Sequence, residues 1–348
     1  MKPTIKDVAK LAGVSIKTVS NVINNNKGRY KEETRQRVLA AMAELNYQPN
    51  RAARYMRSGQ IGIIALTIPD ISNPYFAEIA REVIKAARSY DHTVLIDHTD
   101  GLPEQERLVV QGLRPHAVDG IILDPLTLTE DDLNPEKVVT PIVLLGERMT
   151  NNKYYDHVQI DNVGAARLAV LHLIELGRRR IAIMPVPKDE KDVMSQLRYR
   201  GYLDALQQAG IPVDPSLTVY TSIASFTYYD GEKCMNQLLS LPKPPDAVLC
   251  LNDRVALGAM KTLRLRGYQI PGEVAVVGFD NIEEGSFAAP SLTTIAPDKE
   301  EIAKTAVSLL INRILGKRKG PPELIQTPFR LIVRESTIGV IGASGGNI

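Results

Sequence analysis

The chain has 348 residues, of which 44% are hydrophobic and 24% are charged. This length and balance predict a globular protein of two or three domains. No apolar run approaches the roughly 18 residues that a membrane-spanning helix needs, and Lys2, Lys6, Asp7 and Lys10 interrupt the apolar core of a signal peptide. The cysteines are expected to be reduced thiols, so we expect a cytoplasmic protein with no membrane partner.

The net charge of +2 conceals an asymmetry along the chain. Residues 1–60 contain 12 Lys/Arg and 4 Asp/Glu, a net charge of +8, while the remainder has 30 basic and 36 acidic residues, or −6. A basic module on an acidic body indicates a polyanionic partner that is bound at one end. The charge alone would also fit a solvated basic surface.

Residues 4–45 predict three helices, the first two joined by a tight turn at Gly13. Thr4 and Ser15 are the expected caps of the first two helices. Apolar residues at helical spacing are expected to face inward: Ile5, Val8, Ala9 and Ala12 in the first helix, Val19, Val22 and Ile23 in the second, and Val38, Leu39, Met42 and Leu45 in the third, from about 32 to 45.

The opposite face of the second helix carries Ile16, Lys17 and Asn21. These side chains point outward near the start of a helix, where a helix-turn-helix protein makes its base contacts. Lys and Asn can donate to base edges, and Ile can contact a thymine methyl group. Many helix pairs share this spacing without binding DNA, so the spacing alone does not identify a DNA reader.

The body of the chain alternates apolar strands with helices. This alternation predicts parallel sheets covered by helices on both faces, and its two blocks predict two lobes with a cleft between them. The expected strands are 61–68, 93–96, 120–123 and 141–145, then 181–184, 218–220, 247–251 and 274–278; the expected helices are 75–89, 104–113, 161–176, 198–209, 231–239, 254–266 and 297–315.

Polar residues follow the predicted strands of both blocks, at Asp70, Asp97, Asp124, Asn252-Asp253 and Asp280-Asn281. Ligands of open parallel sheets bind beyond the carboxyl ends of the strands. Carboxylates there, with aromatic rings nearby, suit a polyhydroxylated ligand. Each Asp taken singly is more often a helix cap, so the pattern predicts a cleft without identifying its ligand.

The sequence motifs at the N-terminus indicate a particular family more specifically than the helical periodicity does. Ile-Lys-Asp-Val-Ala-Lys-Leu-Ala-Gly-Val-Ser (5–15) and Glu-Leu-Asn-Tyr-Gln-Pro-Asn-Arg-Ala-Ala-Arg (44–54) closely resemble the LacI/GalR (lactose-repressor/galactose-repressor) family of bacterial transcription regulators. The resemblance continues through Ile-Pro-Asp-Ile-Ser-Asn-Pro-Tyr-Phe (68–76), Leu-Asn-Asp-Arg-Val-Ala-Leu-Gly (251–258) and Val-Val-Gly-Phe-Asp-Asn (276–281). It implies a helix-turn-helix domain and a periplasmic-binding-protein-like core.

For DNA, the resemblance implies base contacts by Ile16, Lys17 and Asn21. It implies a hinge helix that forms on DNA, with Met56 and Arg57 in the minor groove. Met56 departs from the Leu that the family usually has there. The implied contacts to the DNA backbone are Thr4, Ser15, Asn24, Arg51 and Arg54.

For the effector, the resemblance implies contacts from both lobes: Asp70, Tyr75 and Phe76 in the first, and Arg198, Phe226, Asn252, Asp253 and Asp280 in the second. A guanidinium can fork onto adjacent hydroxyls, although Arg198 could equally be a surface arginine of a helix. Residues 184–192 are acidic where purine-binding members of the family supply basic and hydroxyl groups. We therefore expect a sugar or sugar derivative, with a purine or nucleoside as the alternative.

The predicted layout is an all-α helix-turn-helix domain at 1–48, a hinge at 49–60, an α/β regulatory core of two parallel-sheet lobes at 61–340, and a flexible tail at 341–348. We expect residues 61–160 and 293–322 in the first lobe, and 162–290 and 324–340 in the second. One reading helix per subunit needs a two-fold partner, so we expect a homodimer on a near-palindromic operator.

Other classes of protein fit less well. An exported sugar-binding transport protein would share the two lobes but would have no use for residues 1–57. The sequence has no phosphate-binding loop of the G-x-x-x-x-G-K-[ST] type and no G-x-G-x-x-G after a strand. Gly342 to Gly346 match G-x-S-x-G, but no helix follows to form a nucleophile elbow. The histidines lack metal-ligand spacing, so we expect no enzyme activity, cofactor or metal.

Overall fold

The computed structural model describes residues 3–23, 28–47, 60–111, 118–136, 138–149, 152–188, 192–221 and 226–339. The chain divides into two compact units, Met1–Ile61 and Gly62–Ile348. Among the described residues, no helix has the length and apolar character to cross a membrane.

The first unit contains three helices, α1 (Ile5–Ala12), α2 (Ile16–Ile23) and α3 (Glu32–Glu44). Gly13 adopts φ +64° between α1 and α2, a conformation that glycine reaches without strain. Val8, Val19 and Val38, one from each helix, are fully buried at the centre. The helix-turn-helix prediction is confirmed.

One inward position in α3 was predicted wrongly. Leu39 is 37% exposed, and Ala41 is buried in its place. Positions 38, 41, 42 and 45 complete one helical face, and residue 39 lies a further 100° around the helix.

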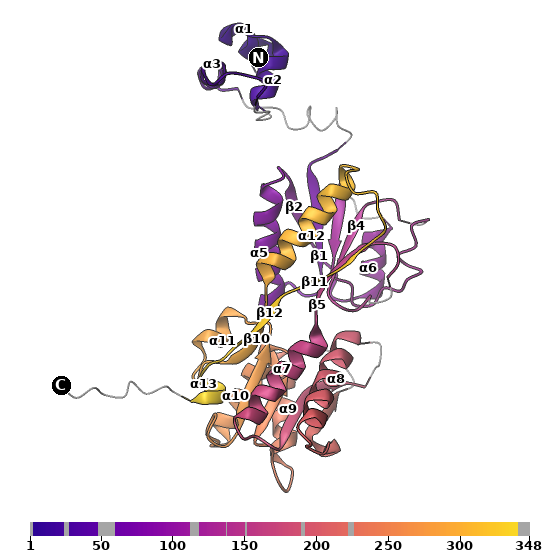
Figure 1. Ribbon diagram of the computed structural model, residues 1–348, viewed down its shortest axis with the longest axis vertical. Coiled ribbons are helices and arrows are strands. Elements are labelled where there is room, and N and C mark those ends of the chain that lie inside the picture. Colours follow the sequence, from indigo (N-terminus) through magenta and orange to yellow (C-terminus); the bar gives the residue numbers. More distant parts are fainter. Residues whose placement is uncertain are drawn as a thin grey trace, which may run out of the picture. The chain divides into compact units, whose positions relative to one another are not determined.

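The first lobe is a parallel sheet in the order β11-β5-β4-β3-β1-β2. Its strands are β1 (Ile63–Ile68), β2 (Thr93–His98), β3 (Gly120–Leu123), β4 (Ile142–Leu145), β5 (Asp156–Ile160) and β11 (Leu324–Thr327). Helices α5 (Pro74–Arg88) and α12 (Lys299–Ile314) pack side by side on one face, and α6 (Pro103–Val110) lies on the other (Figure 1).

Side chains alternate between the two faces of this sheet. Ile64 and Leu66 of β1 belong to the core beneath α5 and α12, whereas Ala65 belongs to the core shared with α6. Continuous apolar strands of this kind are stable only when helices cover both faces, because every second side chain would otherwise meet water.

The second lobe is a mixed sheet in the order β12-β10-β9-β8-β6-β7, in which only the pairing of β10 with β12 is antiparallel among the described strand pairs. Its strands are β6 (Ile181–Pro187), β7 (Thr218–Thr221), β8 (Ala247–Cys250), β9 (Ala275–Phe279), β10 (Thr293–Pro297) and β12 (Phe329–Ile332). Its helices are α7 (Asn162–Glu175), α8 (Val193–Gln208), α9 (Tyr228–Leu239), α10 (Asp253–Leu265) and the short α11 (Glu283–Phe287) and α13 (Glu335–Ile338), with a 3-10 turn at Pro215–Leu217.

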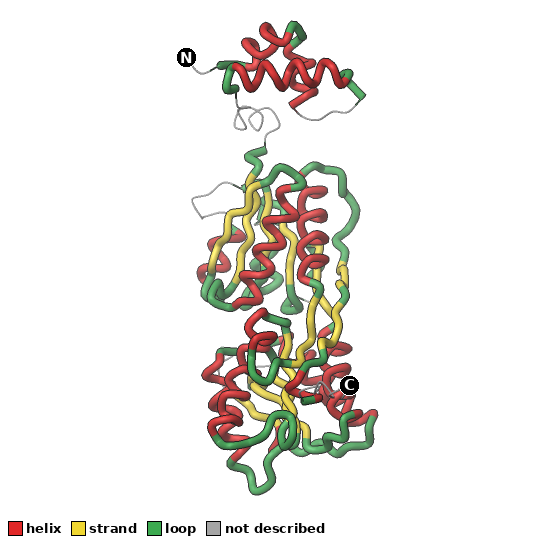
Figure 2. The backbone as a smooth tube through the Cα atoms, turned by 90° about the vertical axis from the view of Figure 1, so that its left-hand side faces the viewer, coloured by secondary structure: helices red, strands yellow, loops and turns green. Residues whose placement is uncertain are grey.

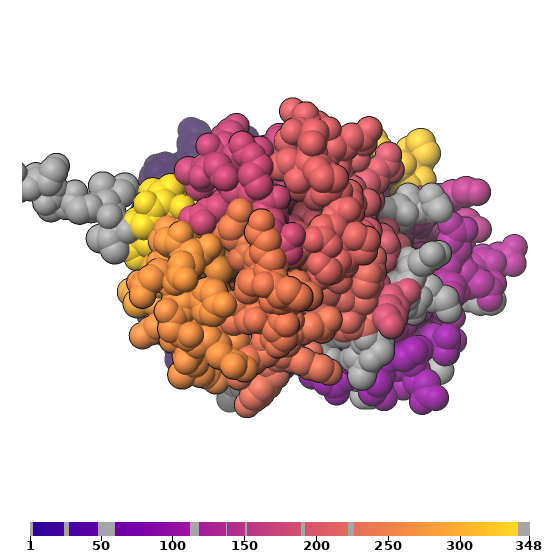
Figure 3. Space-filling view, turned by 90° about the horizontal axis from the view of Figure 1, so that it is seen from below, coloured from indigo at the N-terminus to yellow at the C-terminus, as the bar shows by residue number. Residues whose placement is uncertain are grey.

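Helices α7 and α8 pack together, as do α9 and α10. In Figure 3, which looks at this lobe end-on, its surface runs from magenta (α7) through salmon (α8) to orange (α10). Figure 2 shows strands enclosed by helices in each lobe, with strand-bearing segments connecting the two lobes. The α/β core of two lobes is confirmed.

The predicted boundary between the lobes is wrong for two strands. Strand β10, expected in the first lobe, belongs to the second sheet, and β11, expected in the second lobe, forms the edge of the first sheet. The chain therefore crosses after Pro297 and again at Pro328. Short strands carry no signal for the sheet they join, and β11 is a half-exposed edge strand without a clear apolar run.

Candidate functional site

A cavity of about 630 Å³ lies between the two lobes, where the strands of both sheets end. Its first wall is formed by residues that follow β1, β2, β3 and β4, and its second wall by residues that follow β7, β8 and β9 and by α8. The predicted residues Asp70, Tyr75, Phe76, Arg198, Phe226, Asn252 and Asp280 all line it.

Asp70 joins the two walls. Its carboxylate accepts hydrogen bonds from the Ser72 backbone N–H (2.8 Å) and hydroxyl (2.6 Å), and from the Arg254 guanidinium of the second lobe (2.8 Å). Burial raises the pKa of Asp70, but these hydrogen bonds outweigh it and hold the pKa below its ordinary value. Asp70 is therefore an ionised carboxylate in an ion pair that spans the cavity.

Tyr75 and Phe76 lie in the first turn of α5, which begins with Pro74 and is capped by Asn73. Their rings pack edge to face, with centroids 5.3 Å apart. Aromatic faces held this way suit the C–H face of a sugar or the plane of a base.

Arg198 is buried in α8, so its alternative interpretation as a surface arginine is wrong. Its guanidinium carbon lies 3.3 Å from the centroid of the Phe279 ring. Its Nε donates to Asn162 Oδ1 (2.7 Å), and its NH1 group donates to the carbonyl of Leu251. Stacking and hydrogen bonds fix the plane of this cation at the cavity wall.

Asn252 and Phe226 are joined by a hydrogen bond. The Asn252 side-chain amide donates to the Phe226 carbonyl (3.1 Å), and its oxygen accepts from the Val255 backbone N–H (2.8 Å) as the cap of α10. Asn252 therefore both starts α10 and positions the backbone of an aromatic residue of the cavity.

Asp280 follows β9 and adopts φ +105°, an unfavourable backbone conformation for a residue with a side chain. The residue is 8% exposed, and its carboxyl group accepts no hydrogen bond from the described residues. Burial raises its pKa to about 6, against the opposing effect of Arg198 and Lys299. A strained, buried and unpartnered acid facing a cavity is typical of a ligand-binding residue.

Asp253 is the predicted effector residue that the structure does not bring to the cavity. It is fully buried, and its carboxylate accepts from the Ile282 backbone N–H (2.9 Å) and the Thr294 hydroxyl (2.6 Å). A Cβ on Gly278 would lie 2.1 Å from Asp253 Oδ1. This placement argues against an effector contact: Asp253 ties α10 to β9 and β10.

Five charged residues of the cavity were not predicted as effector contacts: Asp100, Asp124, Glu147, Arg148 and Arg254. Asp124 was expected among the polar residues at strand ends but not as an effector contact, and Asp100, Glu147 and Arg148 follow β2 and β4, where the same rule applies. Arg254 is the second residue of α10, directly after Asn252-Asp253. It pairs with Asp70 only because the two lobes come together. The described residues contain no group of three or more His, Cys, Asp or Glu side chains that could hold a metal ion.

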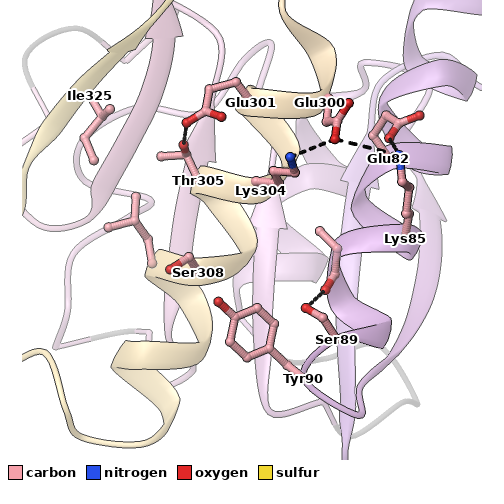
Figure 4. Close-up of a pocket in the computed structure, with 12 residues that line it drawn as sticks. Glu82, Lys85, Ser89, Tyr90, Glu300, Glu301, Lys304, Thr305, Ser308 and Ile325 are labelled. Carbon is pink, nitrogen blue, oxygen red and sulfur yellow. Dashed lines mark hydrogen bonds and ion pairs between the residues drawn. The ribbon is translucent and has the colours of Figure 1, made fainter.

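A second cavity, of about 650 Å³, lies on the first lobe between α5 and α12 (Figure 4). Its charged side chains pair with one another: Lys304 with Glu300 (2.7 Å), and Lys85 with Glu82 (3.2 Å). Glu301, the third acid, accepts from the Thr305 hydroxyl (3.3 Å). Since these side chains already have one another as partners, we assign ligand binding to the cavity between the lobes.

In the first unit, Ile16 and Lys17 are exposed at the start of α2, and Asn21 is half-buried one turn later. Ser15 caps α2, since its hydroxyl accepts from the Thr18 backbone N–H (3.1 Å). The Asp7 carboxylate accepts from the backbone N–H and hydroxyl of Thr4 (2.8 and 2.7 Å).

The other predicted DNA contacts, Asn24, Arg51, Arg54, Met56 and Arg57, lie outside the described residues. Their roles, like those of Ile16, Lys17 and Asn21 in reading bases, stay predictions.

A helix-turn-helix unit followed by a two-lobed core with a polar cavity defines a ligand-responsive DNA-binding regulator. The family model for bacterial regulatory proteins of the lacI family matches residues 4–50, and the model for a periplasmic binding protein-like domain matches residues 170–337. The chain belongs to the lacI family of bacterial transcriptional regulators.

Curated relatives match along nearly their whole length. The chain is 34% identical to the transcriptional repressor CytR of Escherichia coli over 96% of both chains. It is 36% identical to the ribose operon repressor of Halalkalibacterium halodurans over 97% of both.

Solved structures agree with this assignment. The lac repressor dimer bound to operator and the anti-inducer ONPF matches with a TM-score of 0.76 and 28% identity, covering 97% of this chain and 99% of that one. A complex of the regulator CelR with cellobiose matches with a TM-score of 0.70 and 32% identity, covering 96% and 99%.

Proposed function

We propose that this regulator is a repressor whose affinity for a near-palindromic operator is switched by a sugar bound between its lobes. The observation that carries the proposal is the composition of the cavity. Acids and guanidinium groups stand on both of its walls, with the aromatic rings of Tyr75, Phe76 and Phe226 between them. Carboxylates and guanidinium groups bind vicinal hydroxyls, and rings cover the apolar face of a pyranose.

Relatives with sugar ligands support this choice. One solved neighbour is a complex with cellobiose, and a curated relative is a ribose operon repressor. The lac repressor structure is a dimer on its operator. By analogy we propose a homodimer here, without catalytic activity, that works in the cytoplasm where bacterial DNA lies.

The contacts between the lobes suggest how a ligand would act. Besides the ion pair of Asp70 with Arg254, the Lys299 ammonium donates to the carbonyl of Asn281 (3.0 Å), and Arg148 lies 3.5 Å from Asp192. A sugar that contacts both walls would change the balance among these contacts and hence the angle between the lobes. It would shift DNA affinity only as far as it binds the two lobe arrangements differently.

A purine or nucleoside is the second candidate, because Tyr75, Phe76 and Phe226 could also stack on a base. The lining carboxylates favour the sugar, since they accept from hydroxyl groups more readily than they match the acceptor-rich edges of a purine.

The test is a thermal-shift screen of the full chain against sugars, sugar phosphates and nucleobases, followed by operator-binding titrations with each hit. We expect a sugar to raise the melting temperature, because ligand binding to the folded state stabilises it by mass action.

Asp280→Ala should remove the ligand-induced change in operator affinity while leaving operator binding without ligand intact. Asp204→Ala, on α8 outside the cavity, is the matched control and should respond as the wild type does. Hits confined to nucleobases, or an unchanged response in Asp280→Ala, would refute the sugar assignment.

A further inference from the structure

The charges that line the cavity do not balance. Among the described lining residues, three are cations, all arginines, and five are acids, so these residues have a net charge of −2 when all are ionised: Arg148, Arg198 and Arg254 against Asp70, Asp100, Asp124, Glu147 and Asp280. Unscreened like charges in a partly enclosed cavity repel strongly, so either protonation of an acid or a bound cation must offset the excess.

The arginines of the cavity already have acceptors. Arg254 donates to Asp70, and Arg148 donates weakly to the carbonyl of Leu126 (3.4 Å) and lies near Asp192. Arg198 donates to Asn162 and Leu251. An anionic ligand would therefore compete with protein acceptors while facing an excess of carboxylates.

Asp124 is the acid of the cavity whose charge is least compensated by protein groups. It follows β3, and its backbone N–H donates to the Thr67 carbonyl (3.1 Å), which fixes its position at the cavity wall. Its carboxylate accepts no hydrogen bond from the described residues. It lies against Gly146, where an added Cβ would be 3.1 Å from Asp124 Oδ1.

The surroundings of Asp124 disfavour its charge. Burial, and after it the nearby Glu147 carboxylate, raise the pKa of Asp124 to about 8, and Arg148 opposes this only in part. On the other wall, Asp280 is a second unpartnered acid, 8% exposed. With a pKa of about 8, Asp124 is mostly protonated at pH 7 without a ligand. Hydroxyl groups of a ligand could donate to these acids, whereas an ammonium group would donate and would also stabilise the carboxylate form by its charge.

We propose that Asp124 is a specificity-determining residue that receives a basic nitrogen of the effector, so that the cavity binds an amino sugar in preference to the neutral sugar of the same skeleton and rejects its phosphate ester. This inference rests on the proposed function, because it concerns the same cavity and the same switch. It narrows the ligand class from sugars in general to sugars that carry a primary amine.

The experiment is isothermal titration of the full-length chain at pH 7 with two matched sets of probes. One set is D-glucosamine, D-glucose and D-glucose 6-phosphate, and the other is the corresponding galactose series. In at least one set, we expect the amino sugar to bind at least about tenfold tighter than the neutral sugar, as one charge-assisted hydrogen bond in place of a neutral one gives. The phosphate ester should not bind.

Two variants test the role of Asp124. Asp124→Asn keeps the shape and the hydrogen-bonding capacity but removes the charge, so it should weaken binding of the amino sugar about tenfold and leave the neutral sugar within about twofold. Glu130→Gln removes one negative charge from the loop that follows β3, outside the cavity, and should keep the wild-type preference.

The outcomes separate this inference from the proposed function. If neutral sugars bind as tightly as amino sugars and still change operator affinity, the sugar-responsive function stands and the amine preference is refuted. Equal weakening of both ligands by Asp124→Asn would also refute it. If no sugar of either kind binds the wild-type chain, both proposals fail, and this result needs no variant.

Discussion

Two aspartates of the second unit have similarly raised pKa values but differ in their hydrogen-bond partners. Asp253 and Asp124 both have a pKa raised to about 8, with burial as the first cause. The Asp253 carboxylate is satisfied by Ile282 and Thr294, whereas that of Asp124 accepts nothing from the described residues. A buried polar group without a protein partner costs stability, so its retention at a cavity wall indicates a role toward a ligand.

This difference predicts a pH effect on stability. A carboxyl group with a raised folded-state pKa binds more protons when folded than when unfolded, so stability falls as pH rises from about 4 to about 8. Asp124→Asn should remove its share of this fall, and we expect it to raise the melting temperature of the ligand-free protein at pH 8 by a few degrees. At pH 4 the change should be close to zero. Melting curves at both pH values are the measurement; a lower melting temperature of Asp124→Asn at pH 8 would show that its carboxylate is stabilised by partners.

At the scale of elements, most of the candidate site residues lie at the ends of strands and helices. Strands of both sheets deliver their carboxyl ends to one cavity, and helix α8 contributes Arg198 from its middle. In the first unit, the start of α2 presents Ile16 and Lys17 to solvent, while Val19 and Val22 hold the helix against the core. The buried face of α2 packs against the core of the first unit, and its opposite face is left for contact with DNA.

Recognition by α2 can be separated from attraction to phosphates. Asn21→Ala should change the preference among operator sequences, since a lost base contact costs about 1–3 kcal/mol at one position. Arg51→Ala, in the basic segment after α3, should instead weaken binding to all sequences and reduce its salt dependence. Binding to a library of single-base operator variants at two salt concentrations measures both effects. Identical profiles for the two variants would contradict the division between base and backbone contacts.

At the scale of the whole molecule, charge and fold divide the chain at the same place. Residues 1–60 carry a net charge of +8 and the remainder −6, and the compact units meet at Ile61 and Gly62. The helical unit has its own core, and all lining residues of the effector cavity belong to the second unit. DNA affinity and effector affinity should therefore be separable by truncation.

A chain that begins at residue 61 should lose operator binding and keep effector binding within about threefold. Fluorescence anisotropy with labelled operator and titration with the sugar found in the screen are the two measurements. Loss of sugar binding in a folded truncated chain, as judged by circular dichroism, would show that the first unit contributes to the cavity.

The sequence by itself determined the class of fold and much of the site. Helical and strand periods follow from which side chains must avoid water, so they are visible without a structure, and the rule for strand ends located Asp70, Asn252 and Asp280. The resemblance added Tyr75, Phe76, Arg198 and Phe226, which have no periodic signal of their own. The sheets that β10 and β11 join were beyond prediction: β10 is buried and β11 is half-exposed, but a run of four or five residues does not specify its sheet in either case.

Only the tertiary structure decided which of three consecutive residues face the cavity. Asn252, Asp253 and Arg254 are consecutive, yet Asn252 and Arg254 line the cavity while Asp253 turns into the core against Gly278. It also showed that Asp70 pairs with a cation from the other lobe, whereas the Asp124 carboxyl has Arg148 nearby but forms no ion pair or hydrogen bond among the described residues. Asp70 and Arg254 stand 184 positions apart along the chain, and the energy of such a pairing depends on a distance and a burial that arise only when the two lobes come together.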